Sequence, residues 1–237
     1  MVLELGGKSA GIVFADADLD AAAQSVVMNM TLHSGQACVL QTRTLVEESV
    51  HDELVEKVCA LLAGIMVGDP SDATTMMGPV ISAMQRDRVE NHIRSGSTEG
   101  ARPAFGGGRP AGLDEGFYIE PTLFVDARNG MTIAQEEIFG PVGTVIPFRD
   151  QDEAVRLAND TEYGLGAGVW SRDPVKAYGV ARQMRAGSVD VNGGTGGNNT
   201  FGPYGGFKQS GLGREFGEFA FAEFLETKSI GWPAISV

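Results

Sequence analysis

Residues 10–46, AGIVFADADLDAAAQSVVMNMTLHSGQACVLQTRTLV, contain the pattern that decides the fold. The apolar run 10–14 predicts a buried strand. Asp16 or Asp18 can cap the following helix, because an aspartate oxygen accepts hydrogen bonds from free backbone N–H groups. Apolar residues at helical spacing continue to about Leu32, Gly35 ends the helix, and residues 43–46 predict a second strand. A strand, a helix and a strand in this order indicate an α/β unit.

The same alternation of strand and helix continues along the rest of the chain. The further strands are expected at residues 102–105, 118–125, 142–148, 165–170 and 188–192. The further helices are expected at residues 51–66, 82–95, 150–159, 174–185 and 214–225, with residues 193–213 as loop. Pro121 predicts an edge strand or a bend, and residues 227–230 predict a terminal strand or tail. The sequence therefore predicts a three-layer α/β fold, with a mainly parallel sheet flanked by helices and a C-terminal strand or tail.

Composition and charge limit the kinds of molecule and surface that the protein is expected to bind. The 237 residues are 43% hydrophobic, which is enough for one sizeable core, and the formal net charge of -13 disfavours nucleic acid and anionic membrane surfaces. No apolar run approaches the roughly 18–20 residues that a membrane span needs. Two cysteines do not make a disulfide framework, so a reducing cytoplasm is the expected compartment.

Cys38 is the first candidate for chemistry. A free cysteine is most often a small buried apolar residue, and Cys59, in the middle of an apolar helical stripe, is expected to be core. Cys38 instead lies in a turn after a helix. The preceding Gly35 and Gln36 let the backbone come close, so that a backbone N–H can point at an oxyanion formed there. The residue pattern leaves both interpretations of Cys38 open.

Glu4 is the candidate base. It lies between Leu3 and Leu5, where strand alternation puts its side chain on one face alone. A solvated or salt-bridged carboxylate at a strand end is the ordinary interpretation, whereas partial burial would raise its pKa toward that of a useful base. Nothing in the local pattern brings Glu4 and Cys38 together.

Other glycine-rich and histidine-containing segments indicate no nucleotide or metal site. Residues 211–217 have the spacing Gly-x-Gly-x-x-x-Gly after a loop, without the strand and the ribose-binding acid of a dinucleotide fingerprint. Residues 106–108 precede Arg109-Pro110 and not a helix. The three histidines show no metal-ligand spacing, so no metal site is predicted.

Five segments resemble conserved blocks of the aldehyde dehydrogenase superfamily. They are residues 3–8 (LELGGK), 35–38 (GQAC), 136–141 (EEIFGP), 159–165 (NDTEYGL) and 203–211 (PYGGFKQSG). The first two resemble the family's catalytic-glutamate and catalytic-cysteine motifs at their usual separation. The resemblance implies a C-terminal catalytic domain over residues 1–230 and a tail over residues 231–237. The family's N-terminal dinucleotide-binding domain would then be absent.

The resemblance also implies roles for individual residues. Cys38 would be the nucleophile and Glu4 the general base. Glu137 would bind the nicotinamide ribose hydroxyls, with Phe139 beside the nicotinamide. In addition, Tyr204 would line the substrate tunnel.

Asn192 matches a family position near the active-site mouth.

The implied reaction is oxidation of a small aldehyde to a carboxylic acid, through a thiohemiacetal and a thioester on Cys38, with NAD or NADP as cofactor. This chain alone is expected to bind the cofactor weakly and to turn over slowly. Alternatives are a cofactor-independent thiol esterase and a non-catalytic assembly module. The resemblance implies a homo-oligomer that uses the C-terminal strand near residues 227–230.

Overall fold

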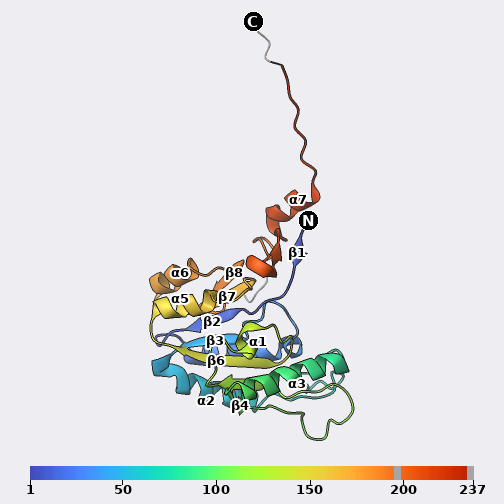
Figure 1. Cartoon of the computed structure of the whole chain (residues 1–237), viewed down its shortest axis with the longest axis vertical. Coiled ribbons are helices and arrows are strands. Elements are labelled where there is room, and N and C mark those ends of the chain that lie inside the picture. Colours follow the sequence, from blue (N-terminus) through green and yellow to red (C-terminus); the bar gives the residue numbers. More distant parts are fainter. Residues whose placement is uncertain (195–198, 234–237) are drawn as a thin grey trace.

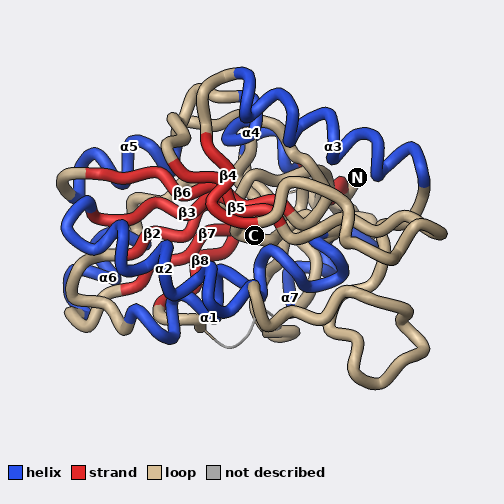
Figure 2. The backbone as a smooth tube through the Cα atoms, turned by 90° about the horizontal axis from the view of Figure 1, so that it is seen from below, coloured by secondary structure: helices blue, strands red, loops and turns tan. Residues whose placement is uncertain are grey.

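A computed structural model describes residues 1–194 and 199–233. Within these residues the central sheet has the strand order β4-β5-β6-β3-β2-β7-β8. Its strands are β2 (Ala10–Val13), β3 (Arg43–Glu47), β4 (Arg102–Phe105), β5 (Thr122–Val125), β6 (Val142–Phe148), β7 (Gly166–Trp170) and β8 (Ser188–Val191). Every neighbouring pair is parallel except β4 with β5, which is antiparallel. Figure 2 shows these strands together, with helices on both sides.

Helices cover both faces of the sheet and make two cores. The longer helices are α1 (Leu19–Thr31), α2 (His51–Leu62), α3 (Ala83–Thr98), α5 (Gln151–Asn159) and α6 (Pro174–Ala181). Successive residues of a strand point to opposite faces. Accordingly, Val13 of β2 packs in the cluster of α1 and α2, whereas Ile12 packs in the cluster of α3, α5 and α6. These three layers confirm the predicted fold class. None of the described helices is long and apolar enough to cross a membrane.

A second, two-stranded sheet joins the beginning of the chain to its last fifth. Strand β1 (Leu3–Glu4) pairs antiparallel with β9 (Gly211–Leu212), so that Glu4 lies opposite Gly211. The next backbone N–H, that of Leu5, donates to the Ser210 carbonyl at 3.0 Å. Figure 1 shows β1 and α7 (Gly217–Phe224) projecting from the same end of the layered body. The pairing fixes the Glu4 backbone against a segment about 200 residues away.

Several predicted boundaries are wrong. The helix predicted over residues 174–185 ends at Ala181, and the one predicted over residues 51–66 ends at Leu62. The helix predicted over residues 214–225 begins only at Gly217. Phe216 before it has φ 62°, which no α-helix accommodates. The predicted loop 193–213 contains β9 and a short 3₁₀ turn (Lys208–Ser210), and part of it, residues 195–198, lies outside the described residues.

Two strand predictions also need correction. Strand β5 begins directly after Pro121 but lies between β4 and β6, so it is not an edge strand. Proline is tolerated there because it precedes the ladder, and the Thr122 N–H then donates to Pro141 O at 2.8 Å. Residues 227–230 form no strand within the described part of the chain. Their extended backbone has no partner strand there, so only the tail alternative fits.

Candidate active site

Cys38 lies in the loop between a 3₁₀ turn (Leu32–Gly35) and β3. The approach to the loop depends on Gly35, which has φ 72°. A Cβ atom at this position would lie 2.1 Å from the Gly140 carbonyl oxygen, so only glycine fits the close backbone approach. Cys38 itself is half-buried and is not in a disulfide. It therefore occupies a shaped turn and not the apolar stripe of α1.

The Gly6-Gly7 segment brings the Glu4 strand against this turn. A Cβ atom on Gly7 would lie 2.3 Å from the Cys38 carbonyl oxygen, so the two backbones are in direct contact. The buried Ser210 hydroxyl donates to the Gly6 carbonyl at 2.7 Å and accepts from the Gly164 N–H at 2.9 Å. Ser210 thus ties the Glu4 segment to the loop that precedes β7, on the side of the sheet where Cys38 lies.

Glu4 is a partly buried carboxylate. Among the described residues, neither of its buried oxygen atoms accepts a hydrogen bond of regular geometry, although the Gly206 backbone N–H lies near the carboxylate. Burial raises the pKa of the Glu4 carboxyl, and the nearby Glu215 carboxylate raises it further, while Arg214 and the Gly206 N–H oppose the shift. A carboxylate that is more basic than usual can take a proton from water near neutral pH. Its environment is that of a base and not of a salt-bridged surface residue.

Tyr204 lies near both candidates. Burial raises the pKa of its hydroxyl, and the next causes are the Cys38 thiol and the Glu4 carboxylate. Its backbone forms a bridge with Glu215, with N···O distances of 2.7 and 2.6 Å. Its ring lies 5.7 Å from that of Phe216. The structure therefore brings Cys38, Glu4 and Tyr204 together, whereas their catalytic roles remain predictions.

Glu137 and Phe139 lie on the other side of the Gly6-Gly7 segment. The Glu137 Oε1 atom accepts from the Gly7 N–H at 3.1 Å. A Cβ atom on Gly6 would lie 2.7 Å from Glu137 Oε2, so the carboxylate fits only because residue 6 is glycine. Phe139 has φ 58° and a partly exposed ring, and it lines a small hollow with Gly7 and Glu137. A carboxylate beside an exposed aromatic ring suits a ribose hydroxyl pair next to a flat heterocycle.

Asn192 lies at a different edge of the sheet. It follows the carboxyl end of β8, whereas Cys38 precedes the amino end of β3, and both strands run in the same direction. Its side-chain amide makes two hydrogen bonds to the backbone of Ser171. It accepts from the N–H at 3.0 Å and donates to the carbonyl at 2.9 Å. The structure does not bring Asn192 to Cys38, and its role at the site mouth remains a prediction.

Arg43 is a large, buried side chain next to the candidate site whose role was not predicted from the sequence. Its side chain is fully buried at the start of β3, five residues after Cys38. The guanidinium donates to Asn129 Oδ1 at 2.6 Å, and to the last carbonyls of α5, Leu157 O at 2.7 Å and Ala158 O at 2.8 Å. A longer bond of 3.4 Å reaches the Lys8 carbonyl. Arg43 therefore caps α5 and joins the cysteine loop to the Glu4 segment.

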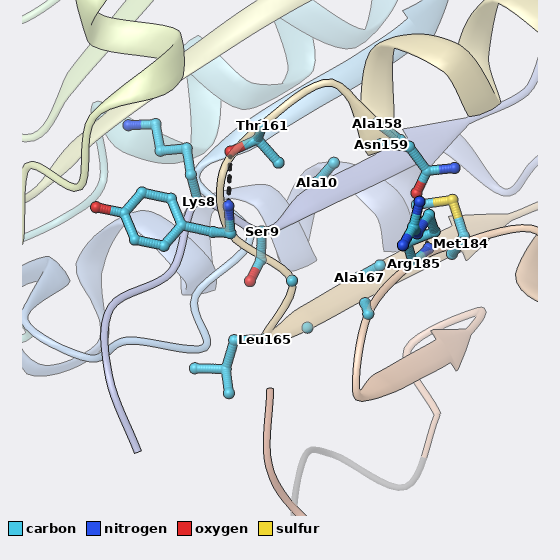
Figure 3. Close-up of a pocket in the computed structure, with 14 residues that line it drawn as sticks. Lys8, Ser9, Ala10, Ala158, Asn159, Thr161, Leu165, Ala167, Met184 and Arg185 are labelled. Atoms are coloured by element: carbon cyan, nitrogen blue, oxygen red, sulfur yellow. Dashed lines mark hydrogen bonds between the residues drawn. The ribbon is translucent and has the colours of Figure 1, made fainter. Parts of the chain in front are cut away.

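Lys8 is a second buried cation, and it lines a small cavity with Thr161 and Arg185 (Figure 3). Burial lowers the pKa of the Lys8 ammonium to about 7. The neighbouring Arg43 lowers it too, whereas the Glu137 and Glu136 carboxylates partly oppose the shift. The folded protein therefore holds Lys8 close to its midpoint of protonation at neutral pH.

The Lys8 pKa predicts a pH dependence of stability. In the unfolded chain the ammonium regains its ordinary pKa of 10.5, so between about 7 and 10.5 the unfolded state binds more protons. Stability from this group is therefore low at neutral pH and rises through that window, by at most about 1.4 kcal/mol per pH unit. In Lys8→Met, urea unfolding should show a free energy that rises less steeply with pH. The matched control is Lys228→Met at an exposed position, and an unchanged slope in Lys8→Met would contradict the assignment.

A groove of about 460 Å³ runs beside the cysteine loop and was not expected from the sequence. Its lining includes Val39, the exposed side chains of Met28 on α1 and Leu32 just after it, and the polar side chains of Asn29 and Gln41. Helix α1 was predicted, but nothing in the sequence showed that part of its face would line a groove. Cys38 itself is not among the lining residues.

The remaining candidates behave as structural residues. Cys59 on α2 is only half-buried against the core, and burial raises the pKa of its thiol. Of the glycines at residues 211–217, Gly211 belongs to β9, Gly213 to the bend after it and Gly217 to the start of α7, and β9 lies in the two-stranded sheet and not in the parallel one. His92 contacts Arg88 O and Glu136. In the part of the chain that the structure describes, no group of three or more His, Cys, Asp or Glu side chains is placed to hold a metal ion.

Known proteins share this architecture. A family model described as the aldehyde dehydrogenase family matches residues 1–230. A putative aldehyde dehydrogenase of Staphylococcus saprophyticus is 46% identical over 229 residues, covering 96% of this chain and 48% of the relative. Related proteins of Staphylococcus aureus are 45% identical over the same length. The chain thus spans about half the length of the curated relatives it matches.

Solved structures agree with this match. An aldehyde dehydrogenase of Mycobacterium tuberculosis, complexed with NAD+, is 46% identical with a TM-score of 0.94, covering 100% of this chain and 49% of that one. The Staphylococcus aureus betaine aldehyde dehydrogenase in complex with NAD+ is 38% identical with a TM-score of 0.92, covering 99% of this chain and 48% of the other. With the motifs, the fold and the family match in agreement, the chain belongs to the aldehyde dehydrogenase family.

Proposed function

We propose that residues 1–230 form the cysteine-bearing catalytic domain of an enzyme that oxidises an aldehyde to a carboxylic acid, and that residues 231–237 are a tail. The observation that carries the proposal is the meeting of Cys38, Tyr204 and Glu4 at one site, with the raised Glu4 and Tyr204 pKa values that this environment produces. A nucleophile and a base, each close to the same hydroxyl donor, are groups that covalent acyl chemistry uses.

The first step is addition of Cys38 to the aldehyde carbonyl. The sulfur forms a bond to the carbonyl carbon, and the carbonyl oxygen becomes an oxyanion. The backbone N–H of Cys38 is the proposed donor to that oxygen. The Tyr204 hydroxyl is protonated at neutral pH, as a phenol is, and its raised pKa keeps it so at more alkaline pH; it can also donate a hydrogen bond within the site. The product is a thiohemiacetal on Cys38.

Glu137 and Phe139 are the proposed contacts for a nicotinamide dinucleotide. The Glu137 carboxylate can accept hydrogen bonds from ribose hydroxyls, and the absence of a side chain at Gly6 keeps space for that carboxylate. When bound, NAD or NADP would supply the hydride acceptor that converts the thiohemiacetal to a thioester. The NAD+ complexes of the Mycobacterium tuberculosis and Staphylococcus aureus relatives support this choice. Chain segments outside this sequence would supply the rest of the dinucleotide site.

The last step is hydrolysis of the Cys38 thioester. Glu4 takes a proton from a water molecule, whose oxygen attacks the thioester carbon. The carbon–sulfur bond breaks to release the acid, and the proton held by Glu4 passes to the leaving sulfur, which restores the thiol and the carboxylate. This step and acylation by an activated ester need only groups that this chain contains. Thiol esterase activity is therefore the second candidate function for the chain by itself.

The proposal can be tested without cofactor. The purified chain is offered an activated ester, and acylation of Cys38 is followed by intact-mass spectrometry, while a small alkylating reagent compares Cys38 with Cys59. We expect Cys38 to acylate and to be alkylated faster than Cys59. If Cys38 reacts no faster than Cys59 and forms no acyl adduct, the non-catalytic assembly module is the better reading.

Glu4→Gln tests the assignment of the base. Glu4 acts as its carboxylate, so deacylation in the wild-type chain should slow as pH falls through the raised pKa of this group. In Glu4→Gln we expect deacylation to fall by about 10²–10⁴-fold and this acidic limb to disappear. The measurement is single-turnover decay of acyl-Cys38 across pH, with exposed Glu218→Gln as control. A Glu4→Gln chain that keeps the limb would refute the role.

Self-association is also part of the proposal. Six large apolar side chains of α7 and the described segment after it are exposed, namely Phe219, Phe221, Phe224, Leu225, Ile230 and Trp232. Exposed apolar clusters of this kind are typical of contact surfaces. Light scattering of the purified chain would show a mass above that of one chain if these residues mediate a homo-oligomer.

A further inference from the structure

We propose that Ser34 and Gln36 are positioning residues. They hold the cysteine loop against residues 78–81, so that the Cys38 backbone N–H stays aligned with an oxyanion formed on the carbon that the Cys38 sulfur attacks. This inference rests on the proposed function, because it takes Cys38 as the nucleophile. It assigns a role to two side chains that act through the backbone of Cys38 and not on the reacting atoms.

The backbone that leads into Cys38 has an unfavourable conformation. His33, Ser34 and Gly35 have φ values of 50°, 57° and 72°, so three successive residues are left-handed. Glycine adopts this conformation freely, whereas the β-carbon makes it unfavourable for His33 and Ser34. Such a segment persists only where the surrounding structure holds it. The contacts that hold this turn therefore determine where the residues after it lie.

Two polar side chains supply such contacts. The buried Ser34 hydroxyl donates to the Gly78 carbonyl at 2.9 Å. The Gln36 side chain makes two hydrogen bonds. Its Oε1 atom accepts from the Ile81 N–H at 3.0 Å, and its Nε2 atom donates to the His33 carbonyl at 3.1 Å. Gln36 thus closes the left-handed turn and fastens it to a separate segment of the chain.

The segment of residues 78–81 has supports of its own. The Val80 N–H donates to the Phe117 carbonyl at 3.1 Å. Directly before the segment, Met77 forms a β-bridge with Val67. Neither pairing involves the cysteine loop. The two polar side chains therefore attach that loop to a support that is fixed independently of it.

The consequence concerns the peptide group between Ala37 and Cys38, which carries the proposed oxyanion donor. Only Ala37 separates Gln36 from Cys38, so a rotation of the left-handed turn would be passed on to this peptide group. Among the described residues, no backbone carbonyl accepts from the Cys38 N–H, which leaves it available to an oxyanion. A donor displaced by about 1 Å loses much of its effect on the transition state.

The test compares two reactions of Cys38, of which only one forms an oxyanion. With p-nitrophenyl acetate, the sulfur adds to the carbonyl carbon and the thiol proton passes to solvent. The oxyanion then expels p-nitrophenolate and leaves an acetyl thioester. With iodoacetamide, the sulfur displaces iodide from carbon in one step. The p-nitrophenolate burst that Cys38→Ser lacks gives the first rate, and peptide mass spectrometry gives the alkylation rates of Cys38 and, as a reporter of folding, of Cys59.

We expect Gln36→Leu to lower acylation by about 10- to 100-fold while alkylation of Cys38 changes by less than about twofold. Leucine has nearly the size of glutamine but makes neither hydrogen bond. Ser34→Ala, which loses one bond, should lower acylation in the same way by about threefold or more. The matched control is Gln183→Leu, which removes an exposed hydrogen bond to the Gly179 carbonyl and should leave both rates unchanged.

Each outcome decides a separate point. Acylation that stays within about twofold of the wild-type rate in both variants overturns the inference and leaves the proposed function standing. If only one variant loses acylation, the assignment fails for the other residue. Equal loss of acylation and alkylation also overturns the inference, because these side chains would then control access to the sulfur or folding and not the oxyanion donor. A wild-type Cys38 that forms no acetyl adduct, and is alkylated no faster than Cys59, overturns the proposed function and this inference with it.

Discussion

Cys38→Ser is expected to lower the rate of acyl transfer from an activated ester by at least about 10³-fold. The thiol is replaced by a hydroxyl, which is far less ionised and far less nucleophilic at neutral pH, while the size of the side chain hardly changes. The turn that holds the residue depends on Gly35 and Gly7, and neither contact involves the sulfur atom. The loss should therefore appear in the chemical step and not in folding.

The matched control is Cys59→Ser. Cys59 packs on α2 and its thiol pKa is raised by burial, so the control should keep full acylation while losing some stability. Burst kinetics with a chromogenic ester and intact-mass detection of the acyl adduct give both rates. If Cys38→Ser kept more than about a tenth of the rate, or if the adduct formed on Cys59, the nucleophile would be misassigned.

Local sequence patterns predicted most of the layered body correctly. The strands at residues 102–105 and 142–148 have the predicted bounds, and α1 begins after Asp18, whose side chain accepts from Ala21 N at 3.1 Å. These features follow from apolar runs, turn residues and capping oxygens, all of which act over a few residues. Helix ends were less predictable. The last turn of α6 gives way to tighter turns, such as Met184 N–H to Ala181 O at 3.2 Å.

The assembly of the site could not be predicted from local patterns. Strands β1 and β9 have two residues each, and the Ser210 hydroxyl bonds to a carbonyl 204 positions earlier in the chain. Such short pairings carry no periodicity that a sequence can show. The roles of Cys38 and Glu4 were predicted through family resemblance, but their proximity comes from these long-range contacts.

The role of Arg43 depends on burial and was missed for a related reason. Arg43 looks like an ordinary charged residue within a strand, and nothing in its neighbours shows that it is fully buried. The one available signal for Arg43 was a cation directly before the Thr-Leu-Val run of a strand expected to be buried, where an unpaired charge would be costly. That signal predicts partners for the guanidinium without identifying them.

Arg43→Met is expected to lower the free energy of unfolding by about 3–5 kcal/mol, as for loss of one member of a buried charged network. Burial lowers the pKa of the guanidinium to about 10, so it remains protonated at neutral pH and donates fully. Methionine fills much of the same volume but leaves Asn129 Oδ1 and the Leu157 and Ala158 carbonyls near the end of α5 without the guanidinium donor.

Urea unfolding of Arg43→Met and of Arg102→Met, measured side by side, separates the effect of losing a buried guanidinium from the effect of losing an exposed one. Arg102 forms an exposed ion pair with Asp126 at 3.1 Å, so its loss should cost less than about 1 kcal/mol. Arg43→Lys should fall between the two, since an ammonium cannot reach all the acceptors at once. Arg43 also contacts the Lys8 carbonyl. The rate at which a reagent alkylates Cys38 should therefore change in the folded Arg43→Met variant. Equal destabilisation in Arg43→Met and Arg102→Met would show that this network does not hold the Cys38 loop against the Glu4 segment.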